Sequence, residues 1–270
     1  MVRLITGAAV AGEERYAWQL AWTVLHHIFR LGNWTDAEAV QRRAVEAARQ
    51  LRDPMLEARE QCNLASVYAR WDRVDEARDH LRQALDVSRG AGDELGQAHA
   101  HYTLAYLEQR QGRYVEALAQ LEQARDRYQA LGQRHTYAHA MNGIGRLYAQ
   151  LGDYARSLSA CESALALMAD VDDRLGLASA LDNAGFAHHH LGRHPEAIAC
   201  YQRAVRIFQE MGDRDDEAST SEHLGDTHLA AGDPVAARRA WQRALALLDA
   251  AEQGAADADQ LRAKLDAPAA

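Results

Sequence analysis

The sequence predicts an all-α fold in which six antiparallel helix pairs follow one another with a period of 40 residues. Three observations support this fold class. Alanine, leucine, arginine, glutamine and glutamate dominate the composition, which favours helices. Glycines recur at a fixed spacing, which is typical of repeat proteins: Gly112, Gly152, Gly192 and Gly232. Apolar residues also recur at i, i+3, i+4 and i+7 on both sides of these glycines, as in amphipathic helices.

Small residues mark the places where the two helices of a pair approach each other. Extending the glycine spacing backwards reaches Asp72 and Gly32, so that six repeats share one register. These two residues and the four glycines are here called the anchors of the repeats. Twelve residues after each anchor the slot holds Ala44, Ala84, Ala124, Ala164, Ala204 and Ala244. Five residues after it the slot holds Ala37, Ala77, Ala117, Ser157, Ala197 and Ala237. A third slot, in the first helix, holds Ala58, Ala98, Ala138, Ala178 and Ala218. Larger side chains at these slots would push the helices apart.

The turns define the boundaries of the repeats. Each anchor glycine suits a left-handed turn at the end of the first helix, and Asp233-Pro234 suits an N-cap before the second. A second turn closes each repeat, as at Leu131-Gly132 and Met211-Gly212. We expect a lead-in over 1–15 and a repeat array over 16–250, with repeats near 16–53, 54–93, 94–133, 134–173, 174–213 and 214–250. Residues 251–270 are expected to form a C-terminal capping helix and tail, with QLRAKL covering the last apolar face.

This pattern resembles the tetratricopeptide repeat (TPR), whose motif is W-x2-L-G-x2-Y, then A-x3-F, A and P. The leucine slot holds Val24, Leu64, Leu104, Ile144, Ala184 and Leu224. The following small slot holds Leu25, Ala65, Ala105, Gly145, Gly185 and Gly225. The tyrosine slot holds Ile28, Tyr68, Glu108, Tyr148, His188 and His228, and the large slot of the second helix holds Gln41, Leu81, Leu121, Cys161, Tyr201 and Trp241. The resemblance implies a right-handed superhelical solenoid, although the closing proline is missing and the period is 40 rather than 34.

A narrower resemblance concerns three C-terminal stretches. They read GFAHHHLGRHPEAIACYQRA, EASTSEHLGDTHLAAGDPVAARRAWQRAL and DADQLRAKL. They are similar to the C-terminal TPR sensor region of actinobacterial antibiotic-regulatory (SARP-type) transcription factors. In that family the repeats follow a DNA-binding domain and an ATPase domain, and neither precedes the repeats in this sequence. The resemblance implies either a fragment of such a regulator or a stand-alone relative.

Several functional classes are disfavoured by composition. The net charge of −9 argues against a general nucleic-acid or membrane-surface role, and no apolar run approaches the roughly 20 residues of a membrane span. Cys62, Cys161 and Cys200 are widely spaced and form no CxxC motif, which favours reduced thiols in a cytoplasmic protein. The sequence has neither a G-x-S-x-G nor an H-E-x-x-H motif, and its sole lysine, Lys264, excludes a Walker A motif. We therefore expect no enzyme activity and no cofactor.

Histidines raise the question of a metal site. Residues 187–197 read AHHHLGRHPEA, but His188, His189 and His190 fan over about 200° around one helix and cannot close on one ion. His188 occupies the tyrosine slot, where a packed, hydrogen-bonded side chain is expected. We expect no native metal ion. The alternative is the pair His135 and His139, which has the i, i+4 spacing of helical metal sites.

The TPR resemblance assigns partner binding to a concave groove lined by the first helix of each repeat. Side chains at these positions are of the types that interfaces use, such as tyrosine, arginine, asparagine and histidine. The candidate groove residues are Arg59, His99, Tyr102, Tyr106, Gln109, Arg110, His139, Asn142, Arg146, Asp182, Phe186 and His189, with His190 on the rim. Asn142 and Arg146 together could clamp a peptide backbone and a carboxylate. A solvated inner face without a ligand is the alternative.

These observations favour a protein- or peptide-interaction module, the sensor or regulatory domain of a bacterial transcriptional regulator. Its expected partner is a protein or peptide segment, including DNA-binding and ATPase domains of the same regulator, with no direct contact to nucleic acid or membrane. One alternative is a receptor for a small ligand or signalling peptide. Another is a self-assembling scaffold, a homo-oligomer in which repeats stack between chains.

Overall fold

The computed structural model describes residues 33–251 and 255–266. Within these ranges the protein is all-helical, with twelve α-helices and no strand, as the sequence predicts. The expected lead-in over 1–15 and the first helix of the repeat near 16–53 lie outside the described residues. The chain divides into two compact units, residues 1–133 and 134–270.

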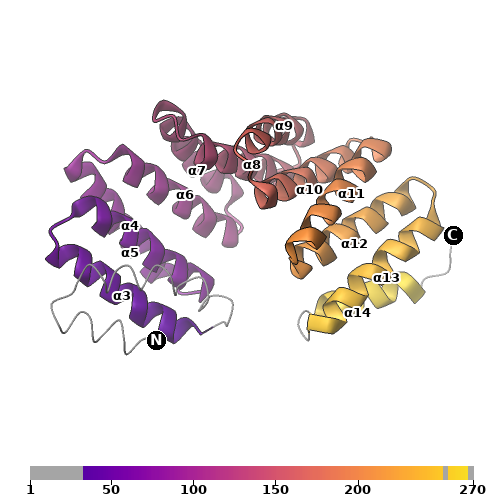
Figure 1. The fold of residues 1–270 in the computed structure, drawn as a ribbon, viewed down its shortest axis with the longest axis horizontal. Helices are drawn as coiled ribbons and strands as arrows, with labels where there is room; N and C mark the ends of the chain where they lie inside the picture. The colour runs from indigo at the N-terminus through magenta and orange to yellow at the C-terminus, as the bar shows by residue number, and fades with distance from the viewer. Residues whose placement is uncertain (1–32, 252–254, 267–270) are drawn as a thin grey trace. The chain divides into compact units, whose positions relative to one another are not determined.

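The helices follow one another at short, regular intervals (Figure 1). Unit 1 contains α3 (Trp34–Gln50), α4 (Pro54–Arg70), α5 (Val74–Ala91), α6 (Glu94–Arg110) and α7 (Tyr114–Ala130). Unit 2 contains α8 (Arg134–Gln150), α9 (Tyr154–Asp170), α10 (Arg174–His190), α11 (His194–Met211), α12 (Arg214–Ala230), α13 (Pro234–Ala251) and α14 (Ala255–Asp266). The even-numbered helices from α4 to α12 are the first helices of their repeats, here called A helices, and the odd-numbered helices from α3 to α13 are the second, or B helices.

Helix packing follows the repeat order. Each A helix packs against the B helix of its own repeat, as α4 against α5 and α10 against α11. Successive A helices also contact each other, α4 with α6 in unit 1 and α8 with α10 in unit 2. The last helix, α14, packs on α13, so that it covers the final B helix of the array.

A left-handed residue occurs in the turns at every twentieth position. Positive φ angles are found at Arg52, Asp72, Gly92, Gly112, Gly132, Gly152, Asp172, Gly192, Gly212 and Gly232. The turn glycines predicted from the spacing therefore have the left-handed backbone that ends a helix. Arg52 and Asp72 adopt the same conformation with a side chain, at φ 53° and 62°, where glycine would be less strained. After most inter-repeat turns an aspartate caps the next helix, as Asp173 does by accepting a hydrogen bond from the Gly176 amide.

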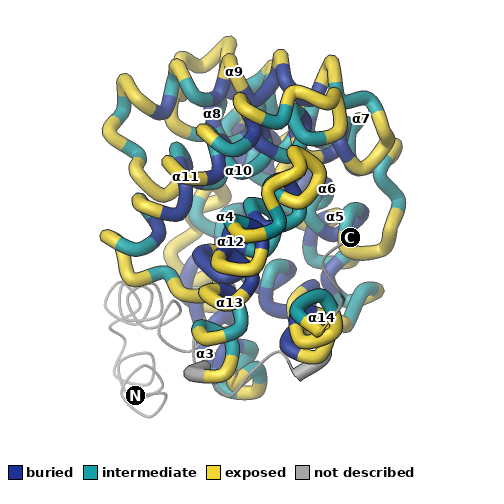
Figure 2. The backbone as a smooth tube through the Cα atoms, turned by 90° about the vertical axis from the view of Figure 1, so that its right-hand side faces the viewer, coloured by how far each residue is buried: buried dark blue, intermediate teal, exposed yellow. Residues whose placement is uncertain are grey.

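The core consists of small residues that lie between paired helices. Every alanine of the three recurrent slots that the structure describes is at most 2% exposed. Figure 2 shows buried and exposed residues alternating along the helices, as expected when one stripe of each helix faces its neighbours. The small slot of the A helix also complements the large slot of the B helix. Gly185 lies against the ring of Tyr201, and Gly225 lies against the ring of Trp241.

Candidate partner-binding surface

The A helices of unit 2 are joined by polar side chains. Asn142 on α8 donates from Nδ2 to Ser179 Oγ on α10 at 3.2 Å, and its Oδ1 accepts from Asn183 Nδ2 at 2.9 Å. Asn142 is buried. Its amide therefore joins α8 to α10, whereas Arg146, the other member of the expected clamp, lies exposed on the same helix.

A second set of polar contacts joins α10 to α12. Asp182 Oδ1 lies 3.1 Å from His223 Nδ1, and His189 Nδ1 is hydrogen-bonded to Thr227 Oγ1 at 2.9 Å. Burial alone lowers the pKa of His223, but the hydrogen bond and charge of Asp182, with further negative charge nearby, raise it above its ordinary value. His189 has a lowered pKa because of burial and neighbouring histidines. The pKa values of the two histidines of this surface are therefore shifted in opposite directions.

An aromatic cluster lies beside these polar contacts of α10 and α12. It consists of Tyr154, Phe186, His190 and His223. The His190 ring stacks on Tyr154 with centroids 4.4 Å apart, and Phe186 lies 4.4 Å from His190 and 5.9 Å from His223. His190 is exposed, and the other three side chains are partly exposed. Partly exposed aromatic rings that are held by one another form a rigid contact surface of the kind that interfaces use.

The capping helix closes the last repeat. Lys264 Nζ on α14 lies 2.7 Å from Glu222 Oε1 and 2.8 Å from Asp226 Oδ1, both on α12. Trp241 Nε1 also donates to Asp226 Oδ1 at 3.0 Å. Glu222 and Asp226 of α12 are thus engaged by this chain's own lysine. The candidate partner-binding residues of unit 2 accordingly centre on α8 and α10.

The candidate residues of unit 1 form two groups on α4 and α6. Tyr102 is 36% exposed, and Tyr106 lies 5.8 Å from the Arg70 guanidinium and accepts a long hydrogen bond of 3.5 Å from Arg110. Gln109, beside Arg110, is partly exposed. A tyrosine pair flanked by arginines is thus presented on α6.

The second group in unit 1, Arg59 and His99, borders a surface hollow. The hollow has a volume of about 590 Å³, and it is lined by Leu51, Asp53, Met55, Leu56, Arg59, Asp93, Leu95, Gly96 and His99. His99 packs on the Tyr128 ring at 5.6 Å, and burial lowers its pKa. Arg59 pairs with Glu60 at 3.3 Å. The structure thus brings Arg59 and His99 together at the edge of one hollow.

Two members of the aromatic cluster, Tyr154 and His223, were missed by the sequence analysis. Tyr154 begins a B helix, and His223 lies one residue after Glu222, which occupies in its repeat the slot of the candidate groove residue Asp182. A signal for Tyr154 existed, because its slot also holds Trp34 and Tyr114. His188 differs from expectation in another way. Its Nδ1 is buried and has no hydrogen-bond partner in the described part of the chain, and burial lowers its pKa.

These features define a helical repeat protein that presents side chains from its A helices. The chain belongs to the tetratricopeptide repeat family, because the family model described as "Tetratricopeptide repeat" matches residues 25–90, 96–170 and 176–250. Proteins of this family bind other proteins or peptides, and this chain is accordingly a protein-interaction module. No curated protein matches the sequence.

Solved structures share the fold. BtubC from P. vanneervenii superposes with a TM-score of 0.70 at 24% identity, over 82% of this chain and 93% of that one. A Rap protein complexed with competence and sporulation factor gives 0.67 at 16% identity, over 92% and 73%. A STAND protein (signal transduction ATPase with numerous domains) with a tetratricopeptide repeat sensor, from Pyrococcus horikoshii, gives 0.70 at 12% identity. The match covers 98% of this chain but only 43% of that larger protein.

None of the helices in the described ranges combines the length and the apolar character that crossing a bilayer requires.

Proposed function

We propose that an extended peptide segment binds to the A-helix face of unit 2, the surface that carries Arg146 on α8 and Phe186 and His190 on α10. We further propose that the chain is the non-catalytic sensor domain of a cytoplasmic bacterial transcriptional regulator. The aromatic cluster around Phe186 carries the proposal. Two supports come from likeness to other proteins. The three C-terminal stretches resemble the sensor region of SARP-type regulators, and the fold is similar to that of a STAND protein with a tetratricopeptide repeat sensor.

The chemistry of this face suggests the character of the peptide. Phe186 and Tyr154 provide partly exposed aromatic area, which favours an apolar or aromatic anchor side chain. Arg146 occupies in α8 the slot that Phe186 occupies in α10, so that a guanidinium flanks the cluster along the repeat axis. We therefore expect a bound peptide to pair one apolar anchor with an acidic group.

Selection from a random linear peptide library displayed on phage, with the purified chain as bait, tests the proposal. Enriched peptides are synthesised and titrated against three variants. Phe186→Ala removes the central ring, Arg146→Glu reverses the flanking charge, and Arg206→Glu makes the same reversal at an exposed position on B helix α11.

Phe186→Ala and Arg146→Glu are each expected to weaken binding at least about 30-fold, which corresponds to the hot-spot threshold of roughly 2 kcal/mol. Arg206→Glu should bind as the wild type does. Peptides that bind both A-helix variants normally but lose affinity for Arg206→Glu would place the site on the B helices instead. The regulator role is tested separately, by measuring whether the chain binds DNA-binding and ATPase domains of SARP-type regulators.

A receptor for small ligands is a second candidate, favoured by the hollow in unit 1. Its wall combines Arg59 and His99 with two carboxylates, Asp53 and Asp93, and with apolar side chains, a mixed lining that suits a small ligand with both polar and apolar parts. Thermal shift with a panel of small polar ligands, free amino acids among them, tests this candidate. Stabilisation that persists in Arg59→Ala would exclude the hollow as the site.

A further inference from the structure

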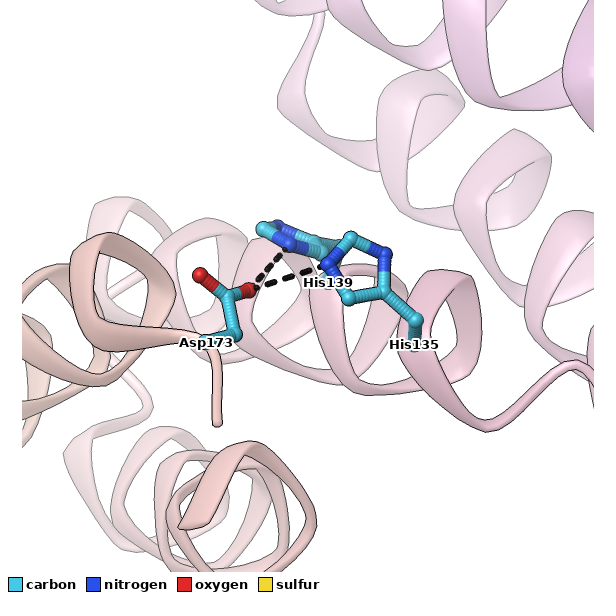
Figure 3. A group of neighbouring side chains, drawn as sticks. All are labelled: His135, His139 and Asp173. Carbon is cyan, nitrogen blue, oxygen red and sulfur yellow. Dashed lines mark ion pairs between the residues drawn. The ribbon is translucent and has the colours of Figure 1, made fainter. Parts of the chain in front are cut away.

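Three side chains with metal-ligating atoms converge in unit 2 at the start of α8. His135 and His139 lie one turn apart on the helix, and Asp173 caps the N-terminus of α10 (Figure 3). His139 Nε2 lies 2.7 Å and His135 Nε2 3.3 Å from the same oxygen, Asp173 Oδ2. The three ligand atoms all lie within 4.8 Å of one another, and no other group of three or more such residues converges in the described ranges.

The separations between these ligand atoms are close to those found around a tetrahedrally coordinated metal ion. Zinc binds imidazole nitrogen and carboxylate oxygen at about 2.0–2.2 Å, so that neighbouring ligand atoms lie about 3.3–3.5 Å apart. The His135–Asp173 separation already has this value. The shorter His139–Asp173 separation needs to open by less than about 1 Å, and His139 is partly exposed, so that its ring has room to turn.

Asp173 is held in the orientation that a ligand needs. Its Oδ1 accepts the capping hydrogen bond from the Gly176 amide at 2.9 Å, which fixes the carboxylate and directs Oδ2 toward the histidines. The side chain is only 13% exposed. Oδ2 is buried and faces the two histidine nitrogens, but neither contact has hydrogen-bond geometry within the described residues. A buried carboxylate oxygen is stabilised by contact with a cation, and a metal ion held between Oδ2 and the two imidazoles would supply that contact.

The repeat register shows that the fold does not need these histidines. The slot of His135 is filled in other repeats by Met55, Leu95, Leu175 and Asp215, and the slot of His139 by Arg59, His99, Ser179 and Ser219. The slot of Asp173 is filled by Asp53, Asp93, Gln133 and Asp213. Of the equivalent triplets in this register, only the repeat that begins at α8 combines two histidines with the aspartate. Their coincidence therefore calls for an explanation other than packing.

The surroundings leave space for an ion, and the nearby arginine side chains are already paired with carboxylates. A hollow of about 390 Å³ adjoins His135, with a wall that includes Arg174 and Met211. Arg174, the cation nearest in sequence to Asp173, is paired with Glu210, and Arg134 is paired with Asp170 at 2.6 Å. Both guanidinium charges are thus compensated. Three protein ligands with an open side are the arrangement in which a fourth ligand comes from water or a bound molecule.

We propose that His135, His139 and Asp173 bind one divalent transition-metal ion of the zinc type. Imidazole nitrogens favour such an ion over Mg²⁺ or Ca²⁺, which prefer oxygen ligands. The site lies at the end of the A-helix face, where an ion would tie the first turn of α8 to the N-cap of α10.

Zinc titration of the tag-free full chain by calorimetry tests the proposal, with Co²⁺ absorption as the readout of tetrahedral geometry. The double variant His135→Leu/His139→Ser introduces the residues that the next repeat carries at these slots, Leu175 and Ser179. Asp173→Asn removes the carboxylate but retains an N-capping side chain. The matched control is Asp213→Asn, the same change at the following N-cap. A second control, His189→Gln, addresses the histidines of residues 188–194.

The wild type, Asp213→Asn and His189→Gln are expected to bind one ion with the same affinity. The double variant and Asp173→Asn should each lose at least about 100-fold in affinity, because loss of an outer-shell partner alone costs 10–100-fold. Circular dichroism verifies that each variant is folded. Equal zinc affinity in the wild type and the folded double variant would overturn the proposal, and so would loss of the ion in His189→Gln.

Discussion

The contact between Gly185 and Tyr201 offers a sharp test of how the repeats pack. A Cβ atom at residue 185 would lie 2.8–3.0 Å from three carbon atoms of the Tyr201 ring. Carbon atoms in contact are normally about 3.5–4.0 Å apart, so that the ring would have to move by at least about 0.5 Å. Tyr201 is 1% exposed, which leaves it no solvent-filled space to enter.

The magnitude follows from two opposing effects. Replacing a glycine within a helix by alanine stabilises the helix by about 1 kcal/mol. Overpacking a core contact costs about 1–3 kcal/mol, and a ring that cannot swing away places Gly185→Ala at the upper end. We therefore expect a net destabilisation of about 2 kcal/mol in urea unfolding at 25 °C.

Two comparisons isolate the cause. Gly90→Ala on α5, where nothing lies within 4 Å of the added methyl group, should be neutral or stabilising by up to about 1 kcal/mol. In the Tyr201→Leu background, Gly185→Ala should stabilise by about 1 kcal/mol, because other repeats already pair alanine with leucine, as Ala65 with Leu81. If Gly185→Ala were equally destabilising in both backgrounds, the proposed packing of α10 on α11 would be refuted.

Three further predictions follow from the turns, the core and one histidine. Ala204→Leu should lower the free energy of unfolding in urea by about 1–3 kcal/mol, because Ala204 is fully buried. Ala119→Leu, at an exposed position, should leave it unchanged. Equal effects of the two substitutions would refute the 40-residue register of the repeats. Arg52→Gly should stabilise by about 0.5–1 kcal/mol, since it relieves a left-handed backbone at φ 53°, and a lower urea midpoint would contradict this. Burial lowers the pKa of His223, but Asp182, Glu222 and Asp226 together outweigh burial and raise it. The protonated ring therefore contributes its full stability below a pH of about 6.5, the ordinary histidine value, and loses it as the pH rises through the folded-state pKa. The stability advantage of the wild type over His223→Gln should therefore shrink as the pH rises above about 6.5, and an advantage that grows would reverse the assigned sign.

The sequence predicted the features of the fold that repeat. Alanines such as Ala204 recur at fixed slots because each repeat faces the same close helix contact, and a single chain with six repeats displays that constraint several times. Turn glycines such as Gly192 recur for the same reason. Arg52 was not recognised as a left-handed residue, because a side chain in that conformation leaves no compositional signal.

The candidate surface was predicted less completely, because it depends on contacts between repeats. Periodicity identifies residues that share a row, but it does not show which side chain of one A helix meets which side chain of the next. Asn142 is predicted from the sequence to clamp a peptide together with Arg146, whereas the structure places its amide between Ser179 and Asn183. His139 was recognised with His135 as a helical pair, whereas Asp173 lies 34 residues after His139 and is brought to it only by the stacking of α10 on α8.

The central claim, that a peptide docks on the A-helix face of unit 2, is tested most directly by ¹⁹F NMR of the chain labelled with fluorophenylalanine. The sequence contains three phenylalanines, Phe29, Phe186 and Phe208. Phe186 lies in the aromatic cluster, whereas Phe208 on α11 is 2% exposed and serves as the internal reference. The Phe186 signal, assigned with Phe186→Leu, should shift on addition of a selected peptide and saturate with its binding curve, while the Phe208 signal stays in place. Saturating binding that leaves the Phe186 signal unmoved would contradict the claim.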